Sequence, residues 1–277
     1  MLVGIPKETG SDERRVAITP AHVASLVALG VDVIVETQAG SRAGFDDAAY
    51  ESQGASVAPS RDAVFQADVV LQVRVPGSPI DALRPGQTLI GLADPLSARD
   101  NIEALAARGV NLFALELLPR ITRAQSMDVL SSMATVAGYK AVLIAAEKLP
   151  KMFPMMVTAA GTVMPAKVLI IGAGVAGLQA IATARRLGAV VTAYDVRPEV
   201  KEEIESLGAR FAELALETRD ARDERGYAKA LGEDFYERQR ALMSTLVEDA
   251  DTTVHWFFND GSVPVTVLVC DIVSSPS

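Results

Sequence analysis

The sequence has few of the residues that form disulfides or bind metals. Cys270 is the only cysteine among 277 residues, so neither an internal disulfide nor a cysteine-based zinc site is possible. The two histidines, His22 and His255, lie far apart in the chain, and a structural role is the simpler interpretation of each. We therefore predict no metal site.

An excess of positive charge is also lacking. Lysine and arginine number 26 against 35 acidic residues, which gives a net charge of −9. This balance argues against nucleic acid as a general partner. The chain opens directly into an apolar run at residues 1–5 without a signal peptide, and no apolar run approaches the roughly 20 residues that span a bilayer. We expect a cytoplasmic protein.

Recognisable hydrolytic or phosphotransfer motifs are absent too. The sequence contains no nucleophile elbow and no Walker loop. Dehydrogenases that oxidise an alcohol or an amine must also move a proton, so they need a positioned acid or base. Passing a hydride between two nicotinamide rings moves no proton at the reacting carbons and needs only positioning. The scarcity of histidine fits the second kind of reaction.

The most informative stretch is residues 166–180. Residues 168–171 form an apolar run typical of a buried parallel strand, and glycines follow with the G-x-G-x-x-G spacing, at Gly172, Gly174 and Gly177. These glycines allow a tight turn, close approach of a pyrophosphate and close helix packing, and the helix N-terminus then favours an anion. The spacing alone is a weak signal, because glycine turns also serve packing.

The context strengthens a dinucleotide prediction. A helix ends at Gly188, and a second strand at residues 190–194 ends in Asp195. A carboxylate about 20 residues past the glycines accepts hydrogen bonds from the adenosine ribose hydroxyls. It also repels a 2′-phosphate, which favours NAD(H) over NADP(H). Arg197 nearby is the one feature against this preference.

Alternating strands and helices predict the fold class. Apolar runs at 2–5, 31–36, 67–74, 88–92 and 110–115, with helices near 20–29 and 97–108, indicate an α/β domain with a doubly wound parallel sheet. Thr19 and Pro20 provide the cap and first position of the first helix. We predict an N-terminal domain over 1–126, a connecting helix and linker over 127–164, and a second, Rossmann domain over 165–277.

Two segments allow more than one interpretation. Residues 119–132 lie at the domain junction, where their polar side chains either contact a carboxamide and ribose or form an ordinary capped helix start at Ser126. Residues 217–240 carry both charge signs, and they are either a solvated helix and loop or a lid over bound nucleotide. Six of the eight methionines lie between Met127 and Met164, which favours adaptable packing at an interface over a substrate pocket.

Two of these stretches closely resemble a known family. Residues 119–128 (Pro-Arg-Ile-Thr-Arg-Ala-Gln-Ser-Met-Asp) and 159–184 resemble the NAD(H)-binding domain of proton-translocating nicotinamide nucleotide transhydrogenase. Residues 5–8 and 15–20 resemble the opening that this family shares with alanine dehydrogenase. The resemblance covers about residues 1–250. It implies a soluble, usually homodimeric domain that binds NAD(H) and presents its nicotinamide to an NADP(H)-binding partner subunit. A membrane proton-channel subunit then couples hydride transfer to proton movement.

The resemblance also implies residue roles. The loop that meets the nicotinamide and the partner nucleotide matches Arg120, Gln125, Asp128 and Ser131. The adenosine and pyrophosphate site matches Gly172, Gly174, Val175, Ala176, Gly177, Asp195, Val196 and Arg197. The family's mobile loop matches residues 226–229, which include Tyr227. This match favours the lid interpretation of residues 217–240 over a solvated helix and loop. The implied location is cytoplasmic, with peripheral attachment to the inner membrane through partner subunits.

Alanine dehydrogenase is the alternative. In that family the residue matching Arg15 binds the pyruvate carboxylate, and a lysine stands where this sequence has Arg74. The family's catalytic histidine has no counterpart here, because residues 89–95 read Leu-Ile-Gly-Leu-Ala-Asp-Pro. The missing acid/base disfavours this reading.

The resemblance ends after Asp251. Residues 252–260 do not match the family, and only four or five strands of the usual six can be placed in the second domain. We expect this domain to be incomplete at its C-terminal end, through truncation or a frame shift. A non-catalytic NAD-binding remnant is therefore a further alternative.

Overall fold

The computed structural model describes residues 1–119, 121–213, 233–259 and 262–271. The chain divides into two compact units, Met1–Val129 (unit 1) and Leu130–Ser277 (unit 2). The boundary falls at the start of the long helix that the sequence assigns to a connecting segment.

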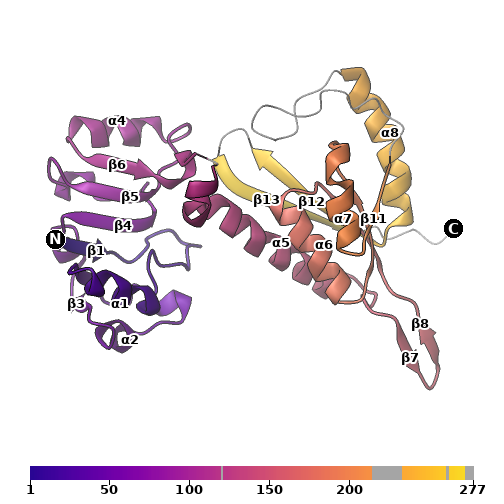
Figure 1. Ribbon diagram of the computed structural model, residues 1–277, viewed down its shortest axis with the longest axis horizontal. Helices are drawn as coiled ribbons and strands as arrows, with labels where there is room; N and C mark the ends of the chain where they lie inside the picture. Colours follow the sequence, from indigo (N-terminus) through magenta and orange to yellow (C-terminus); the bar gives the residue numbers. More distant parts are fainter. Residues whose placement is uncertain (120, 214–232, 260–261, 272–277) are drawn as a thin grey trace. The chain divides into compact units, whose positions relative to one another are not determined.

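Unit 1 is a doubly wound α/β sheet, as predicted (Figure 1). All its strand pairs are parallel, in the order β3-β2-β1-β4-β5-β6. The strands are β1 (Leu2–Ile5), β2 (Asp32–Glu36), β3 (Ser56–Ala58), β4 (Val69–Arg74), β5 (Thr88–Leu92) and β6 (Asn111–Ala114). The helices are α1 (Pro20–Ala28), α2 (Asp47–Glu51), α3 (Arg61–Val64) and α4 (Arg99–Ala107). The short elements α2, β3 and α3 are additions that the sequence analysis did not place.

Helix α1 begins as the sequence predicts, with one difference in its cap. Thr19 stands at the N-cap and Pro20 at the first helical position, and Gly30 follows the helix end with φ of +75°. The hydroxyl of Thr19 does not cap the helix but forms a 2.8 Å hydrogen bond with Nδ1 of His22. His22 is exposed, and this contact joins its ring to the start of α1.

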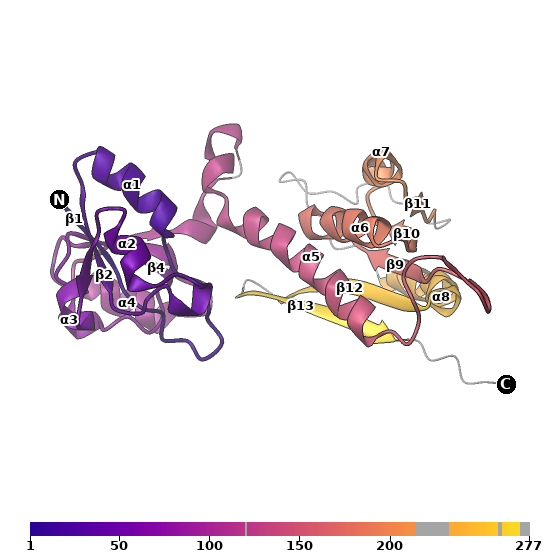
Figure 2. The same cartoon turned by 90° about the horizontal axis from the view of Figure 1, so that it is seen from below.

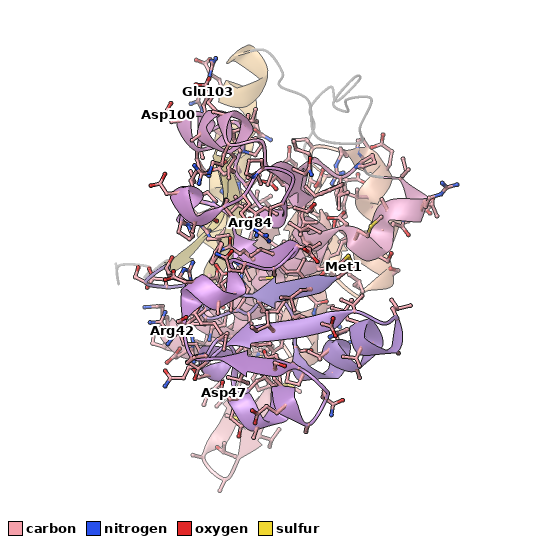
Figure 3. The ribbon with its side chains drawn as sticks, turned by 90° about the vertical axis from the view of Figure 1, so that its left-hand side faces the viewer. Met1, Arg42, Asp47, Arg84, Asp100 and Glu103 are labelled. Carbon is pink, nitrogen blue, oxygen red and sulfur yellow. The ribbon has the colours of Figure 1, made fainter. Side chains whose placement is uncertain are left out.

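Apolar side chains fill both faces of the unit 1 sheet. One cluster joins Val3, Ile5, Val33 and Val35 with side chains from α1 and α2, and another joins Val70, Leu89, Phe65 and Leu105. Strands covered on both faces explain the near-continuous apolar runs in the sequence. Side chains also form hydrogen bonds with the connecting loops. Arg84, labelled in Figure 3, donates to the backbone carbonyl of Gln66.

Unit 2 holds a five-stranded sheet in the order β11-β10-β9-β12-β13. Its strands are β9 (Lys167–Ile171), β10 (Val190–Tyr194), β11 (Arg210–Phe211), β12 (Thr252–Asn259) and β13 (Ser262–Asp271). Its helices are α5 (Val129–Lys148), α6 (Val175–Arg186), α7 (Lys201–Ser206) and α8 (Glu233–Asp249). Four strands are parallel, which is the Rossmann-like core that the sequence predicts.

The last strand differs from that parallel core. β13 pairs with β12 in the antiparallel direction. Only residues 260–261 separate the two strands in the sequence, and a parallel return needs a crossover of about a dozen residues or more. A further antiparallel pair, β7 (Met156–Thr158) with β8 (Gly161–Val163), forms a hairpin in the segment that the sequence analysis assigned to a linker.

Helix α5 packs against α6 in unit 2 (Figure 2). Its buried residues are Gly138, Ala141, Val142 and Ala145, which recur at helical spacing and join the core cluster of the sheet. By length and composition α5 alone among the described helices could cross a membrane, with 20 residues and a mean hydropathy of 1.5. This corrects the expectation that no apolar run approaches that length. One such helix is a weak indication, since core helices share these properties.

Candidate functional site

The glycine turn between β9 and α6 is the centre of the candidate site. Gly172 has φ of +95°, in the left-handed region that favours glycine, and its N–H donates to the carbonyl of Tyr194 over 2.8 Å. Gly174 is the N-cap of α6, and a Cβ placed there would meet no atom within 4 Å. The backbone is therefore open to a ligand at the start of a twelve-residue helix. Such an opening suits a phosphate.

Asp195 follows β10 and ties this turn to the neighbouring strand. Its Oδ2 accepts a 2.7 Å hydrogen bond from the N–H of Ala173, inside the glycine turn. The side chain is only 6% exposed. The carboxylate that the sequence predicted is thus in place beside the turn, and it also holds the turn's conformation.

Arg197 is bound to the same carboxylate. Its Nε and backbone N–H both lie 2.9 Å from Oδ1 of Asp195, and its Nη2 lies 3.0 Å from Oδ2. With the bond from Ala173, each oxygen accepts two hydrogen bonds, which occupies about all four acceptor positions of a carboxylate. A ribose that bonds Asp195 must therefore share these positions with Arg197 or displace its side chain.

This environment sets the protonation state of Asp195. Burial raises the pKa of its carboxyl group, but the hydrogen bonds from Arg197 and from the N–H of Ala173 outweigh burial, so the pKa lies below its ordinary value of 3.8. The Asp195 carboxylate in turn raises the pKa of Arg197. At neutral pH the pair is ionised on both sides.

The other residues assigned to the adenosine and pyrophosphate end surround the turn. Ala176 and Gly177 are buried in the first turn of α6, and Val175 is 45% exposed at its start. Val196, which follows Asp195 in the sequence, is half-buried. Tyr227 and residues 214–232 lie outside the described residues, so the lid prediction stays a prediction.

The residues assigned to the nicotinamide end lie near the boundary between the units in the sequence. Gln125 is exposed in a 3-10 turn, Thr122–Met127, whose end is Asp128, and Ser131 is half-buried in the first turn of α5. Arg120 lies outside the described residues. The predicted helix start is wrong by two residues, because α5 begins at Val129, so Ser126 is inside the 3-10 turn and does not cap the helix.

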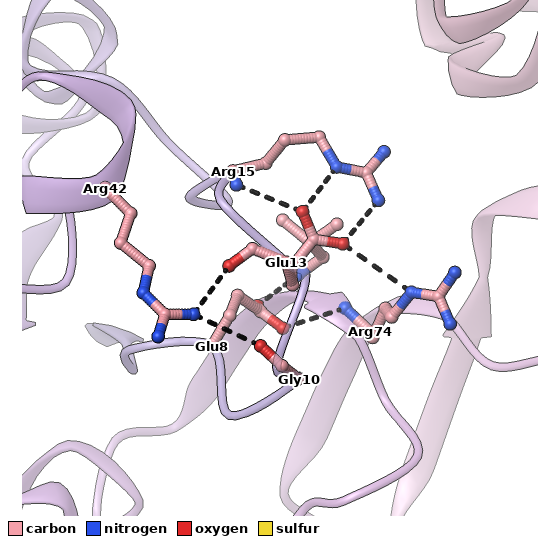
Figure 4. A network of polar contacts seen from close by, with 7 residues as sticks. Glu8, Gly10, Glu13, Arg15, Arg42 and Arg74 are labelled. Atoms are coloured by element: carbon pink, nitrogen blue, oxygen red, sulfur yellow. Dashed lines mark hydrogen bonds and ion pairs between the residues drawn. The ribbon is translucent and has the colours of Figure 1, made fainter.

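A second polar cluster, in unit 1, contains Arg15 and Arg74, two of the positions on which the alternative reading was weighed (Figure 4). Arg15 forms a two-pronged ion pair with Glu13, through Nε–Oε1 and Nη2–Oε2 distances of 2.7 and 2.6 Å. Nε of Arg74 lies 3.5 Å from the same carboxylate. Glu8 accepts hydrogen bonds from the N–H groups of Val73 and Arg74, and burial raises its pKa. Both arginines are thus bound to Glu13.

The sequence analysis missed the buried acids of this cluster. Glu8 stands in the stretch 5–8 used for the resemblance, and Glu13 lies outside it. Nothing in their spacing shows that Glu8 meets the backbone of Arg74 or that Glu13 meets the side chains of Arg15 and Arg74. Within residues 89–95, the region where the alternative has its histidine, Asp94 has φ of +49°, and its N–H donates to Glu116. The sequence offers only a weak signal, because Glu8 and Glu13 lie in a short polar stretch, residues 7–15, that carries both acidic and basic residues.

Family models match both halves of the chain. The model described as alanine dehydrogenase/PNT, N-terminal domain, matches residues 4–137. The model described as alanine dehydrogenase/PNT, C-terminal domain, matches residues 141–256. The second match contains the glycine turn and Asp195.

Curated relatives and a solved structure point the same way. NAD(P) transhydrogenase subunit alpha of Cereibacter sphaeroides is 46% identical over 92% of this chain, which spans about half (49%) of that relative. A shorter NAD(P) transhydrogenase alpha-subunit chain of Rhodospirillum rubrum is 47% identical over 90% of this chain and 67% of the relative. A crystal structure of transhydrogenase from Sinorhizobium meliloti superimposes with a TM-score of 0.81 and 46% identity, over 92% of this chain and 69% of that one.

Proposed function

The chain belongs to the alanine dehydrogenase/PNT family, and we propose that it is the NAD(H)-binding component of a proton-translocating nicotinamide nucleotide transhydrogenase. The observation that carries the proposal is the carboxylate of Asp195, held against the glycine turn by its bond to Ala173. A ribose acceptor beside an open phosphate turn is the arrangement that dinucleotides require. The relatives' names supply the reaction.

In this proposal each part of the site has one task. The first turn of α6, with Gly172, Gly174 and Gly177, holds the pyrophosphate, and Asp195 accepts from the adenosine ribose. The bound nicotinamide ring carries the hydride. The residues Arg120, Gln125, Asp128 and Ser131 position its carboxamide and ribose for the NADP(H) held by a partner subunit.

The protein's own contribution is positioning rather than proton transfer. Hydride exchange between two nicotinamides requires the reacting carbons at about 3–3.5 Å and no acid/base residue. A membrane partner couples the exchange to proton movement, and this chain attaches to the membrane through its partners on the cytoplasmic side.

The alternative, an alanine dehydrogenase, receives less support from unit 1. Its carboxylate-binding arginine corresponds to Arg15, whose guanidinium is already paired with Glu13. The position of the catalytic histidine falls in residues 89–95, which contain none. Pyruvate- and ammonia-dependent oxidation of NADH by the chain alone would favour this alternative.

The experiment that tests the proposal measures hydride exchange with and without a partner. The purified chain alone should transfer no hydride from NADH to an NADP analogue. Addition of the NADP(H)-binding subunit of a homologous enzyme should produce exchange, measured as a change in absorbance of the analogue. Binding of NADH without exchange in that mixture would instead select a non-catalytic NAD-binding protein.

We also propose that the chain is a homodimer joined through the β7–β8 hairpin, which projects from unit 2 (Figure 1). Apolar side chains at and beside the hairpin are unusually exposed, with Met155 at 59%, Val157 at 79% and Met164 at 64%. An exposed apolar patch of this kind marks an interaction surface.

A charge placed in the hairpin tests this. Val157→Asp should shift the chain from a dimer toward the 29.3 kDa monomer in sedimentation equilibrium, because the new carboxylate would lose its hydration in the interface. The control is Leu96→Asp, which makes the same kind of change at an equally exposed residue of unit 1 (76%) and should leave the mass unchanged. A dimer that survives Val157→Asp would place the contact elsewhere.

A further inference from the structure

A histidine stands where the strand order of the unit 2 sheet reverses. β10 lies on one side of β9 and β12 on the other, and the register places His255 of β12 beside Ile171, the last residue of β9. On the other side, Tyr194 pairs with the same Ile171. Tyr194, Ile171 and His255 therefore form one row across three parallel strands, immediately before the glycine turn at Gly172.

The pleat of β12 assigns His255 to one face of the sheet. Its neighbour Val254 is fully buried in the cluster that contains Ile170, Ala193 and side chains of α5 and α6. Because successive side chains point to opposite faces, His255 lies on the other face, which it shares with Tyr194. That face is covered by α8, whose Gln239 donates to the hydroxyl of Tyr194 over 2.8 Å.

The protonation state of the His255 imidazole suits an uncharged group of a ligand. His255 is half-buried, and burial lowers its pKa below the ordinary value of 6.5. At pH 7 its ring is therefore mainly neutral, with one nitrogen donating and the other accepting a hydrogen bond. Hydroxyl and amide groups match such a ring, whereas a phosphate matches the charged form.

The dinucleotide must extend toward this residue if it occupies the turn. Ligands of doubly wound sheets lie across the carboxyl ends of the strands at the switch point, here between β9 and β12. The adenosine ribose is assigned to Asp195 on the β10 side and the pyrophosphate to the turn after β9. The remaining half of the molecule then crosses to the β12 side.

We propose that His255 contacts the nicotinamide riboside half of the bound dinucleotide, through a hydrogen bond to a ribose hydroxyl or to the carboxamide. This inference rests on the proposed function, because it requires a dinucleotide at the glycine turn. His255 is then a ligand-binding residue of the β12 side of the site, opposite Asp195.

The full chain offers a direct spectroscopic test that needs no change at His255. It contains two histidines, so the imidazole protons give two reporters in an NMR spectrum. His22 lies in unit 1 and serves as an internal control, assigned with the variant His22→Gln. NADH should shift the His255 signals and leave the His22 signals in place. ADP, which lacks the nicotinamide riboside, should shift them much less.

A matched pair of variants measures the contribution to binding. His255→Asn should weaken NADH binding about tenfold in calorimetry, equivalent to about 1.4 kcal/mol, and should change ADP binding less than about twofold. His22→Asn should change neither. A thermal melt of each variant establishes that it is folded.

Different failures separate the two hypotheses. Binding of NADH without a shift of His255, or an equal loss of NADH and ADP affinity in His255→Asn, would overturn the assignment of His255 and leave the proposed function standing. If the folded wild-type chain binds neither NADH nor ADP, the proposed function fails, and the role of His255 fails with it.

Discussion

Replacing Gly138 with valine should destabilise unit 2 by about 3 kcal/mol and lower its melting midpoint by roughly 6–12 °C. Gly138 faces α6 from the middle of α5. A Cβ at this position would lie 2.2 Å from the carbonyl oxygen of Ala176 and 3.1 Å from the Cβ of Gln179. The first of these contacts is to backbone, so no side-chain rotation can relieve it.

Two opposing contributions determine whether a substitution at Gly138 stabilises or destabilises unit 2. Removing a helical glycine gains about 1 kcal/mol of helix propensity, and this gain alone would stabilise Gly138→Ala. Overpacking against a backbone carbonyl costs about 1–3 kcal/mol and more for a larger side chain. A Cβ at 2.2 Å from the carbonyl oxygen would force α5 and α6 apart. We therefore expect the cost of the clash to exceed the gain in helix propensity even for alanine, and by more for valine.

The consequence reaches the candidate site. Ala176 belongs to the first turn of α6, which is assigned to the pyrophosphate, so moving α6 away from α5 should also weaken ADP binding. Thermal unfolding followed by circular dichroism gives the melting midpoint of each variant. The control is Lys140→Val on the exposed side of α5, which introduces the same β-branched residue. Equal stability of both variants would contradict the close packing of α5 and α6.

The close packing of Gly138 cannot be predicted from the sequence, whereas the glycine turn can. The β9–α6–β10 segment is predicted almost residue for residue, because an apolar run, spaced glycines and a terminal acid all mark it locally. Gly138, by contrast, looks like a mild defect in a helix. Its role depends on the distance between two helices, which only the folded structure contains.

The missed and shifted elements have similar physical causes. The three residues of β3 carry little pattern of their own, and the strand forms because β2 offers a parallel partner. The start of α5 moves to Val129 because a 3-10 turn takes the preceding residues. The antiparallel direction of β13 follows from a connection too short for a crossover. The bond from Ala173 to Asp195 joins residues whose proximity the motif implies, but its effect on the turn does not follow from the motif.

Replacing Asp195 with alanine should weaken NADH binding about a hundredfold, equivalent to about 2.8 kcal/mol. The change removes the proposed acceptor for the ribose hydroxyls, and it also removes the acceptor of the 2.7 Å bond from Ala173, which should loosen the glycine turn. Calorimetric titration with NADH and NADPH measures both affinities. The wild-type chain should bind NADH more tightly, since the ionised carboxylate repels a 2′-phosphate.

The affinity for NADPH should respond to Asp195→Ala differently from the affinity for NADH. In Asp195→Ala the repulsion is gone, and the guanidinium of Arg197 is no longer held by the carboxylate through Nε and Nη2. An arginine at this place accommodates a 2′-phosphate. The preference for NADH should therefore vanish or reverse. The double variant Asp195→Ala/Arg197→Ala should lose whatever NADPH affinity the single variant gains.

A neighbouring acid provides the control for charge alone. Glu199 is exposed in the turn Pro198–Val200, and its charge also acts on Arg197. Glu199→Gln removes one negative charge without touching the glycine turn, so NADH affinity should stay within about twofold, as expected for a screened surface charge. A folded Asp195→Ala variant with wild-type NADH affinity would contradict the site. Under the proposed function Asp195 accepts from the ribose, and it also holds the turn through Ala173. Its replacement should therefore cost more NADH affinity than the loss of any single ribose contact.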